Sequence, residues 1–393
     1  MKRINIFATV IVLLSISLFP RNEALAQEFK TRSNKIGAPG IEKIIQDGNF
    51  NEAIVKLNEK LESEPNNTEL LNLLGDLYNY MALYKEAINI YEKSYKIDSN
   101  SHALFGEAIV NFLIGDLDES KKQFIIVIRS GYRLIDSYNF MGKIELLNGD
   151  LAEAEKYFNK TYSIDSVNID AITNLGIIYQ QLELNARAEM FLKKAVDLSS
   201  NDSDSYLNLG VFYGMTDKFN EAVINLNKAI SLNSNNKKPY RALGVLYLNH
   251  AIFAEAENNF NKVLKLDPFD SEAYFNLIVL YAQQSDYNKA IKTFEKMQIL
   301  GLSHPQLYIA VSNIYFKQNN LEEALKYSKM QVASYPDKIE GYLALLGMYK
   351  FMGLDREYDE LYEKVKEKIP LSSNNMTKEI HETITNFLNN NRK

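Results

Sequence analysis

Small residues return at a fixed spacing along most of this chain of 393 residues. The spacing is 34 residues between consecutive members of the series Gly142, Gly176, Gly210 and Gly244. It continues backwards to Ala108, and forwards at positions where other residues replace the glycine. A period of this length is typical of a chain built from one repeated unit, in which each unit packs only against its neighbours.

Other columns of residues keep the same phase as the small one. Three residues after it, most repeats have a tyrosine (Tyr78, Tyr179, Tyr213, Tyr247, Tyr281, Tyr315 and Tyr349). Twelve residues after it, most have an alanine (Ala87, Ala154, Ala188, Ala222, Ala256, Ala290 and Ala324). Sixteen residues after it comes a bulky apolar side chain (Tyr91, Phe124, Phe158, Leu192, Leu226, Phe260, Phe294 and Tyr362).

These columns predict two amphipathic helices in each repeat. Leu175, Gly176 and Tyr179 lie on one stripe of a first helix, and Ala188 and Leu192 lie on one stripe of a second. The small residues should let the two helices approach closely. Between the helices we expect a side-chain oxygen to cap the second helix, at Asp116, Asp150, Asp286 and Asn320. Prolines fall between repeats, where a helix stops or starts (Pro39, Pro65, Pro239, Pro268, Pro305, Pro336 and Pro370).

The small–Tyr–Ala–aromatic–Pro pattern resembles the tetratricopeptide repeat, over residues 39–370 and about nine full repeats plus a partial one. The resemblance implies an all-α fold, a right-handed α-solenoid superhelix of stacked antiparallel helix pairs. It also implies that the first helices line a concave face, here called the inner face, which in many family members holds an extended peptide. The second full repeat fits least well, because Asn111 replaces the tyrosine and Ser120 the alanine.

The beginning of the chain has the layout of a cleavable secretory signal. Lys2 and Arg3 precede an apolar run from Ile4 to Phe19, and a small-residue site ends at Ala26. The run has 16 residues, fewer than the roughly 20 that cross a bilayer, which argues against an uncleaved anchor. We therefore predict a signal peptide over 1–26, export to the periplasm or the outside, and no stable membrane span after cleavage.

Two further segments flank the repeats. Residues 27–38 are mostly polar and are interpreted as a flexible leader. In residues 376–393, Ile380, Ile384, Phe387 and Leu388 fall on one helical stripe, which indicates a helix that caps the last repeat.

Motifs of common enzyme classes are missing from the sequence. There is no cysteine, the four histidines are scattered, and no phosphate-binding loop or hydrolase elbow occurs. The net charge of −6 argues against a nucleic-acid partner, because a phosphate backbone needs a basic face. We predict no catalytic residue, no metal and no cofactor, and, since the repeat uses all the long helices, not an enzyme.

Candidate binding residues come from the column two before the small residue. Asn174, Asn208 and Asn276 occupy it, with Ala242 between the last two, and an amide can both donate to and accept from a peptide backbone. Lys238 and Arg241 are predicted on the same face, where they could meet an acidic group. Apolar contact could come from Leu207, Phe275 and Phe316. The alternative is that the three asparagines only cap or bridge neighbouring helices.

Three functions follow, in decreasing order of preference. The first is an exported scaffold that binds protein or peptide partners and assembles envelope or secretion complexes. The second is a periplasmic chaperone that holds peptides, and the third, far behind, is a hydrolase. A shared fold does not choose between the first two, and the sequence indicates neither the partner nor the oligomeric state.

Overall fold

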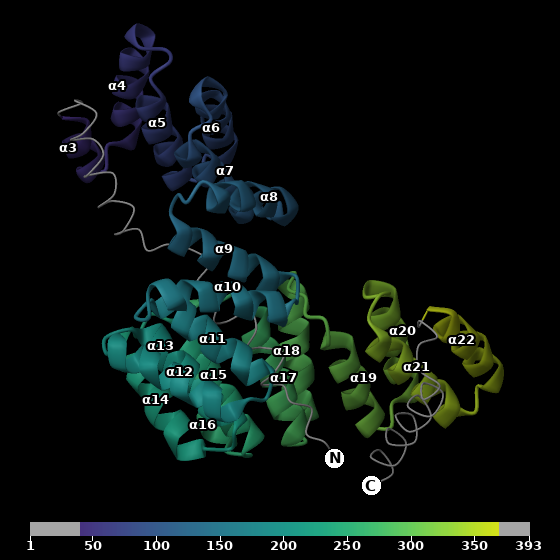
Figure 1. The fold of residues 1–393 in the computed structure, drawn as a ribbon. Coiled ribbons are helices and arrows are strands. Elements are labelled where there is room, and N and C mark those ends of the chain that lie inside the picture. Colours follow the sequence, from purple (N-terminus) through teal and green to yellow (C-terminus); the bar gives the residue numbers. More distant parts are fainter. Residues whose placement is uncertain (1–39, 369–393) are drawn as a thin grey trace. The chain divides into compact units, whose positions relative to one another are not determined.

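A computed structural model describes residues 40–368 of the chain. The predicted signal peptide (1–26), leader (27–38) and capping helix (376–393) lie outside the described residues. Over 40–368 all regular secondary structure is helical, from α3 (Ile41–Gln46) and α4 (Phe50–Ser63) to α22 (Asp355–Lys368) (Figure 1). The prediction of an all-α fold is confirmed.

From α5 onwards, first and second helices alternate with the period of the sequence. The first helices are α5 (Thr68–Tyr80), α7 (Ser101–Ile114), α9 (Leu134–Leu147), α11 (Ile169–Gln181), α13 (Ser203–Met215), α15 (Lys237–Asn249), α17 (Ser271–Gln283), α19 (Leu307–Lys317) and α21 (Ile339–Met352). The second helices are α6 (Tyr84–Asp98), α8 (Leu117–Arg129), α10 (Leu151–Ile164), α12 (Asn185–Leu198), α14 (Phe219–Leu232), α16 (Phe253–Leu266), α18 (Tyr287–Ile299), α20 (Leu321–Ser334) and α22.

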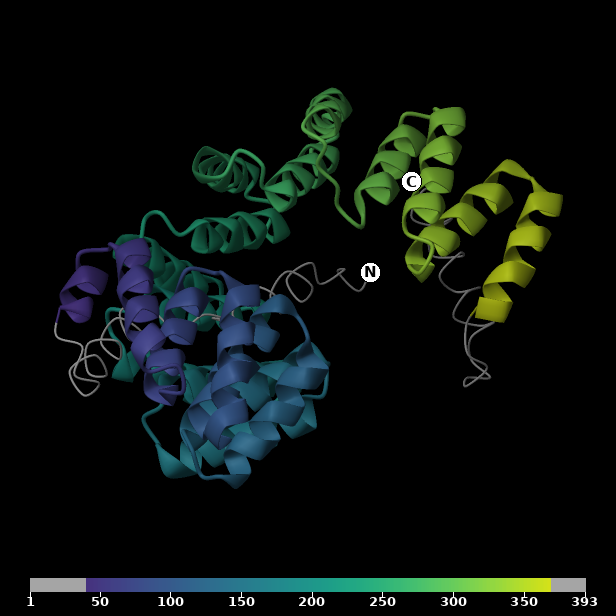
Figure 2. The ribbon, with the colours of Figure 1, turned by 90° about the horizontal axis from the view of Figure 1, so that it is seen from above.

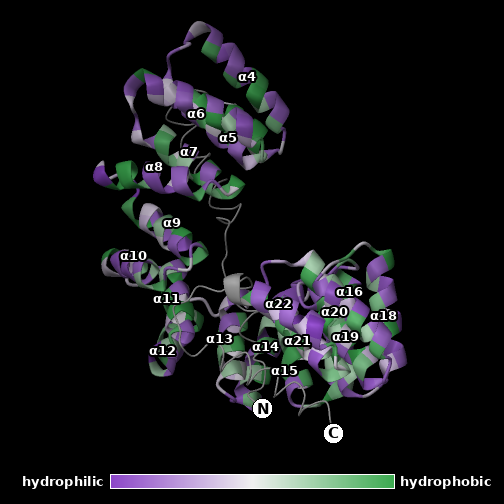
Figure 3. Ribbon diagram, turned by 90° about the vertical axis from the view of Figure 1, so that its right-hand side faces the viewer, coloured by the Kyte–Doolittle hydropathy of each residue, from purple (hydrophilic) through white to green (hydrophobic). Residues whose placement is uncertain are grey.

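The helices pack in sequence order, so the chain is a solenoid of helix pairs. It divides into two compact units, and the boundary lies within α14, between Asn225 and Leu226. In the N-terminal unit α5 contacts α6 and α7, and α11 contacts α12 and α13. In the C-terminal unit α19, α20, α21 and α22 follow one another as neighbours (Figure 2). Green and purple residues mix along each helix, as expected where one face is buried (Figure 3).

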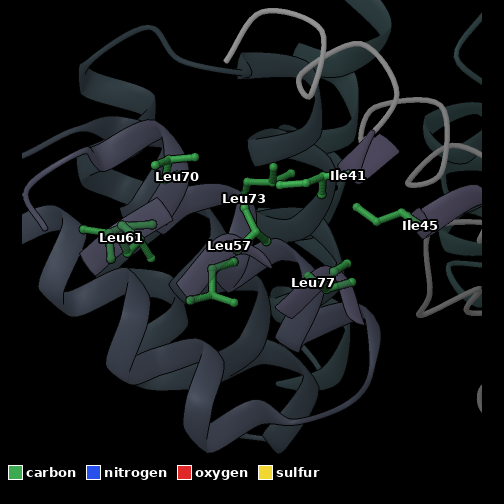
Figure 4. Packing of buried hydrophobic residues seen from close by; sticks show 10 residues of the cluster. Ile41, Ile45, Leu57, Leu61, Leu70, Leu73 and Leu77 are labelled. Carbon is green, nitrogen blue, oxygen red and sulfur yellow. The ribbon is translucent and has the colours of Figure 1, made fainter. Parts of the chain in front are cut away.

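Apolar clusters fill the space between consecutive helices. The first of them lies in the N-terminal unit, where Ile41 of α3, Leu57 of α4 and Leu73 and Leu77 of α5 are buried together (Figure 4). The column of the partial repeat, Ala53 and Leu57, therefore packs like the columns of the full repeats.

The predicted close approach of the two helices in a pair is confirmed. A Cβ atom added at Gly142 would lie 2.6 Å from the ring of Phe158, and one added at Gly244 would lie 2.5 Å from the ring of Phe260. Since such contacts are shorter than real Cβ atoms make, a larger residue in this column would push the helices apart.

One pair reaches the same closeness with different residues. In α19 the small residue is Ser312, and the partner position of α20 is Ser328 instead of a bulky apolar side chain. Their hydroxyl oxygens are 2.8 Å apart, and Ser312 Oγ also donates to the carbonyl oxygen of Ala324 at 2.8 Å. Ser312 is larger than the glycine of other repeats, and Ser328 is smaller than their bulky apolar residue, so the two changes compensate for each other.

This exchange of volume predicts a pair of stability effects. Ser328→Phe should lower the free energy of unfolding by about 1–3 kcal/mol, because the ring collides with Ser312. Adding Ser312→Gly recreates the glycine–phenylalanine pair of the other repeats, so the double variant should recover most of the loss. Urea unfolding followed by circular dichroism measures both. A single variant as stable as the native chain would contradict the packing argument.

The predicted caps of the second helices are also confirmed. Asp116 Oδ1 accepts from the backbone N–H of Glu119, and Asp150 Oδ1 from that of Glu153. Asp286 and Asn320 bond in the same way to the N–H groups of Lys289 and Glu323. Each cap satisfies one of the N–H groups that a helix start leaves without an intrahelical partner.

The least regular repeat replaces packing by a buried hydrogen-bond network. Asn111, in the tyrosine column, donates from Nδ2 to Gln123 Oε1 at 2.9 Å, and Gln123 Nε2 donates to Glu107 at 2.7 Å. Ser120, in the alanine column, donates to the carbonyl oxygen of Ala108 at 2.8 Å. Burial raises the pKa of the Glu107 carboxyl. The polar side chains that replace the tyrosine and the alanine of the pattern therefore have hydrogen-bond partners within the same repeat.

The tyrosine column also links neighbouring repeats. Tyr179 Oη donates to Glu155 at 2.8 Å, and Tyr213 Oη donates to Glu189 at 3.2 Å, in each case 24 residues back in the preceding second helix. Hydrogen bonds from Lys193 and Lys218 also reach Glu189 and lower its pKa from 4.5 to about 2. Glu189 thus fastens α12 to α13.

The depressed pKa of Glu189 makes this joint sensitive to acid. The folded-state pKa lies below the unfolded value, so the ionised carboxylate stabilises the fold above pH 4.5, and this stability is lost as the pH falls towards 2. Glu189→Gln should therefore lower stability at pH 7 and flatten its decline between pH 4.5 and 2 in urea unfolding.

Glu92→Gln is the matched control, because Glu92 forms an exposed pair with Lys96 within one helix and such pairs contribute little. Equal pH profiles for the native chain and Glu189→Gln would contradict the assignment.

Candidate peptide-binding surface

The predicted binding residues lie on first helices in both units, and each unit is described by itself. Asn174 of α11 and Leu207 and Asn208 of α13 belong to the N-terminal unit. Lys238 and Arg241 of α15, Phe275 and Asn276 of α17, and Phe316 of α19 belong to the C-terminal unit.

The asparagines of the N-terminal unit are covered by neighbouring side chains. Asn174 is 5% exposed, and its Nδ2 donates to the carbonyl oxygen of Asp170 at 2.8 Å, one turn back in α11. Its Oδ1 is buried without a hydrogen-bond partner. Asn208 is 6% exposed. Contact between successive first helices explains the burial, because α11 packs on α13 as well as on α12.

The three apolar candidates are part of the packed interior. Leu207, Phe275 and Phe316 are all buried. The Phe275 ring stacks on the His304 ring with centroids 3.7 Å apart, and the Phe316 ring packs on Phe351 at 4.7 Å. As they stand, these side chains stabilise the repeats and offer little surface, so a role in binding stays a prediction.

Asn276 is the least satisfied polar side chain among the predicted residues. It is 1% exposed, and neither its Nδ2 nor its Oδ1 has a hydrogen-bond partner. The Nε of Arg241, on the preceding first helix, is also buried and unpaired. A buried polar group without a partner costs about 1–3 kcal/mol. The C-terminal unit therefore holds two unpaired donors and one unpaired acceptor on α15 and α17.

Arg241, one of the two positive charges predicted to meet an acidic group, and its neighbour Lys237 have carboxylate partners within the chain. Lys237 bonds to Asp267 and Asp270, and Arg241 Nη1 lies 3.7 Å from Asp270 Oδ2. Burial lowers the pKa of Lys237, but the bonds to the two aspartates outweigh this effect and raise it. Because Lys237 and Arg241 already have carboxylate partners, a neutral hydrogen-bonding group suits them better than an acidic one.

His304 joins the turn after α18 to α17. Its Nε2 lies 3.4 Å from Glu272 Oε1, and its Nδ1 accepts from the backbone N–H of Gln306 at 3.2 Å. The hydrogen bond from His304 lowers the pKa of Glu272. The imidazole thus fixes Phe275, next to Asn276, from the side of the following repeat.

Sequence reasoning missed a second column of asparagines, one residue before the first. Asn72 Nδ2 donates to Asn100 Oδ1 at 3.1 Å, and Ser94 Oγ donates to Asn72 Oδ1 at 2.7 Å. Asn139 Nδ2 donates to Asn168 Oδ1 at 3.2 Å in the same way. Asn100 and Asn168 cap the next first helix, so these asparagines bridge repeats. The sequence does contain a pattern that could have predicted these bridges: each asparagine is followed by another asparagine 28 or 29 residues later.

Two other kinds of feature are absent from residues 40–368. No group of three or more His, Cys, Asp or Glu side chains in this part of the chain could hold a metal ion. No helix within it is long and apolar enough to cross a membrane.

Comparison with known proteins identifies the repeat. Residues 68–101, 135–168, 169–202, 203–236 and 241–301 match the tetratricopeptide repeat family, and the chain belongs to it. The least regular repeat, between 101 and 135, is outside these matches. No curated protein matches the chain in sequence.

Solved structures share the fold at low sequence identity. One is the APC/C hetero-tetramer Cut9–Hcn1, with a TM-score of 0.55 and 19% identity, covering 66% of this chain and 52% of that one. Another is a tetratricopeptide repeat protein from Parabacteroides merdae, with a TM-score of 0.53 and 18% identity, covering 62% of this chain and 97% of that one. The chain thus spans about half of the first protein and nearly all of the second.

Substitution of Asn276 tests whether its amide is unpaired. Asn276→Leu should raise the free energy of unfolding by about 1–3 kcal/mol, because an apolar side chain of similar shape removes the buried polar atoms. Asn72→Leu should lower it by a similar amount, because Asn100 and Ser94 lose their partner. If urea unfolding shows both variants to be destabilised alike, the Asn276 amide is paired in solution and the site has no basis.

Proposed function

We propose that this chain is an exported scaffold that binds an extended peptide segment of its partner on the inner face of its first helices, in the assembly of envelope or secretion complexes. Membership in the tetratricopeptide repeat family supports a role in binding proteins. Export is supported by the charged start, apolar run and small-residue site of residues 1–26.

The unpaired amide of Asn276 is the observation that carries the proposal. A peptide bond offers one N–H and one carbonyl oxygen, which complement the free Oδ1 and Nδ2 of Asn276. Arg241 Nε provides a further donor on the preceding first helix. The ion pairs of Lys237 and Arg241 with Asp270 favour a neutral ligand such as the peptide backbone.

Binding requires the Asn276 amide to turn out of its covered position, since it is buried without a ligand. Rotation about the terminal bond only redirects the oxygen and nitrogen, so uncovering the amide takes a change of χ1 from one staggered rotamer to another. The peptide then gives hydrogen-bond partners to the Nδ2 and Oδ1 atoms of Asn276, which have none without it. Each such hydrogen bond contributes about 0.5–1.5 kcal/mol.

Affinity capture from native envelopes with residues 27–393 tests this proposal. A variant with Asn174, Asn208 and Asn276 changed to Ala should lose the dominant partner that the native chain retains. The matched control changes Asn58, Asn225 and Asn259 to Ala. These exposed asparagines each donate to a carbonyl oxygen one turn back, as Asn174 does, but lie on α4, α14 and α16, outside the first helices.

An unchanged partner in the first variant would contradict binding through these amides. A broad set of weakly held proteins would instead favour the peptide-holding chaperone. Export with cleavage of the signal peptide predicts that the mature protein begins at Gln27. Mass spectrometry of the endogenous chain tests this prediction.

A further inference from the structure

A second group of polar side chains lies in the N-terminal unit, away from the predicted peptide-binding residues. It brings together Asp76 of α5, Tyr91 of α6, His102 of α7 and Tyr132 of the turn before α9. Tyr91 Oη donates to Asp76 Oδ1 at 2.7 Å. His102 Nε2 lies 3.1 and 3.2 Å from the two carboxylate oxygens of Asp76, and His102 Nδ1 lies 2.9 Å from Tyr132 Oη.

The contact between His102 and Asp76 requires a hydrogen atom or a metal ion between the two side chains. A carboxylate has only acceptor atoms, and an imidazole nitrogen without a proton is also an acceptor. Two such groups approach to 3.1 Å only when a proton or a metal ion lies between their lone pairs. Without a metal, the Nε2 proton fills this place and Tyr132 donates to Nδ1.

We propose that Asp76, Tyr91 and His102 bind a ferric ion, with Tyr132 as the residue that orients His102. The ligand set is a carboxylate, a phenolate and an imidazole, hard oxygen and nitrogen donors that suit iron. The carboxylate and phenolate neutralise two of its three positive charges. The third ligand is the phenol of Tyr91, so the site does not need three side chains from among His, Cys, Asp and Glu.

Two spacings between donor atoms are compatible with a metal ion that has ligands at right angles. Metal–ligand bonds of about 2.1 Å at right angles place neighbouring donors about 3.0 Å apart. Tyr91 Oη and His102 Nε2 lie 2.7 and 3.1 Å from the same oxygen, Asp76 Oδ1. The ion would replace the phenol proton of Tyr91 and the Nε2 proton of His102, and both protons would leave to solvent.

Tyr132 supplies the outer contact that a metal-bound histidine needs. When Nε2 gives its lone pair to the ion, Nδ1 carries the remaining proton and donates it to Tyr132 Oη. Such a bond fixes the tautomer and ring orientation, and its loss costs 10–100-fold in metal affinity. The two rings also meet edge to face, with centroids 6.1 Å apart.

The surroundings hold one ligand rigidly and leave the others accessible. Tyr91 is fully buried, and its ring lies against the backbone of Gly75 and Gly106, where any larger residue would collide with it. The side chains of His102 and Asp76 are 13% and 17% exposed. Solvent therefore reaches the imidazole and carboxylate, and water can complete the coordination of the ion.

Titration of the full chain with ferric citrate tests the proposal. The native chain should bind one ion, gain a visible phenolate-to-iron absorption band and unfold at a higher temperature. Tyr91→Phe keeps the buried ring and should abolish the band. His102→Gln should weaken binding at least 10-fold, and Tyr132→Phe by 10–100-fold with the band retained.

Tyr281→Phe is the matched control. It removes a phenol that donates to Glu257 at 2.7 Å with no imidazole in the contact, so it should leave iron binding unchanged. Thermal unfolding of each variant without iron shows whether it folds. The proposal is overturned if the native chain binds no iron, if Tyr91→Phe keeps the band, or if Tyr281→Phe weakens binding as much as His102→Gln.

Discussion

The contact between the small residue of a first helix and the bulky side chain of its second helix sets the distance between the two helices. A phenylalanine ring under Gly142 or Gly244 leaves no room for a Cβ atom. The same close contact occurs between Gly176 and Leu192, so it recurs in several helix pairs. Within each pair, a cap fixes the start of the second helix, and tyrosine–glutamate bonds join neighbouring repeats.

The parts of the fold that follow from local rules could be predicted from the sequence. A helix start needs a side-chain acceptor, and close helices need a small residue, so Asp150 and Gly142 revealed their roles by type and spacing alone. The exchange at Ser312 and Ser328, and the network around Asn111, could not be predicted. These residues look like losses of the pattern until their partners, 12 to 16 residues away, are seen in contact.

The candidate site was predicted by residue type but not by environment. The asparagine column pointed to the inner face, yet contact between successive first helices covers Asn174 and Asn276. The charges of Lys238 and Arg241 suggested an acidic partner, but Arg241 lies beside Asp270 of the chain itself. Burial and pairing depend on neighbours in the next repeat, which spacing alone does not identify. The binding residues stay a prediction, and the structure adds one specific feature to it: the buried amide of Asn276 has no hydrogen-bond partner, which costs stability.

If a partner binds at the unpaired amide of Asn276, side-chain NMR will detect the contact. In a chain labelled with ¹⁵N-asparagine, the NH₂ signal of Asn276, assigned with Asn276→Leu, is followed while the captured partner is added. We expect a large shift for Asn276 and none for Asn259, which is exposed on a second helix. Partner binding that leaves the Asn276 signal unchanged would contradict binding at this amide.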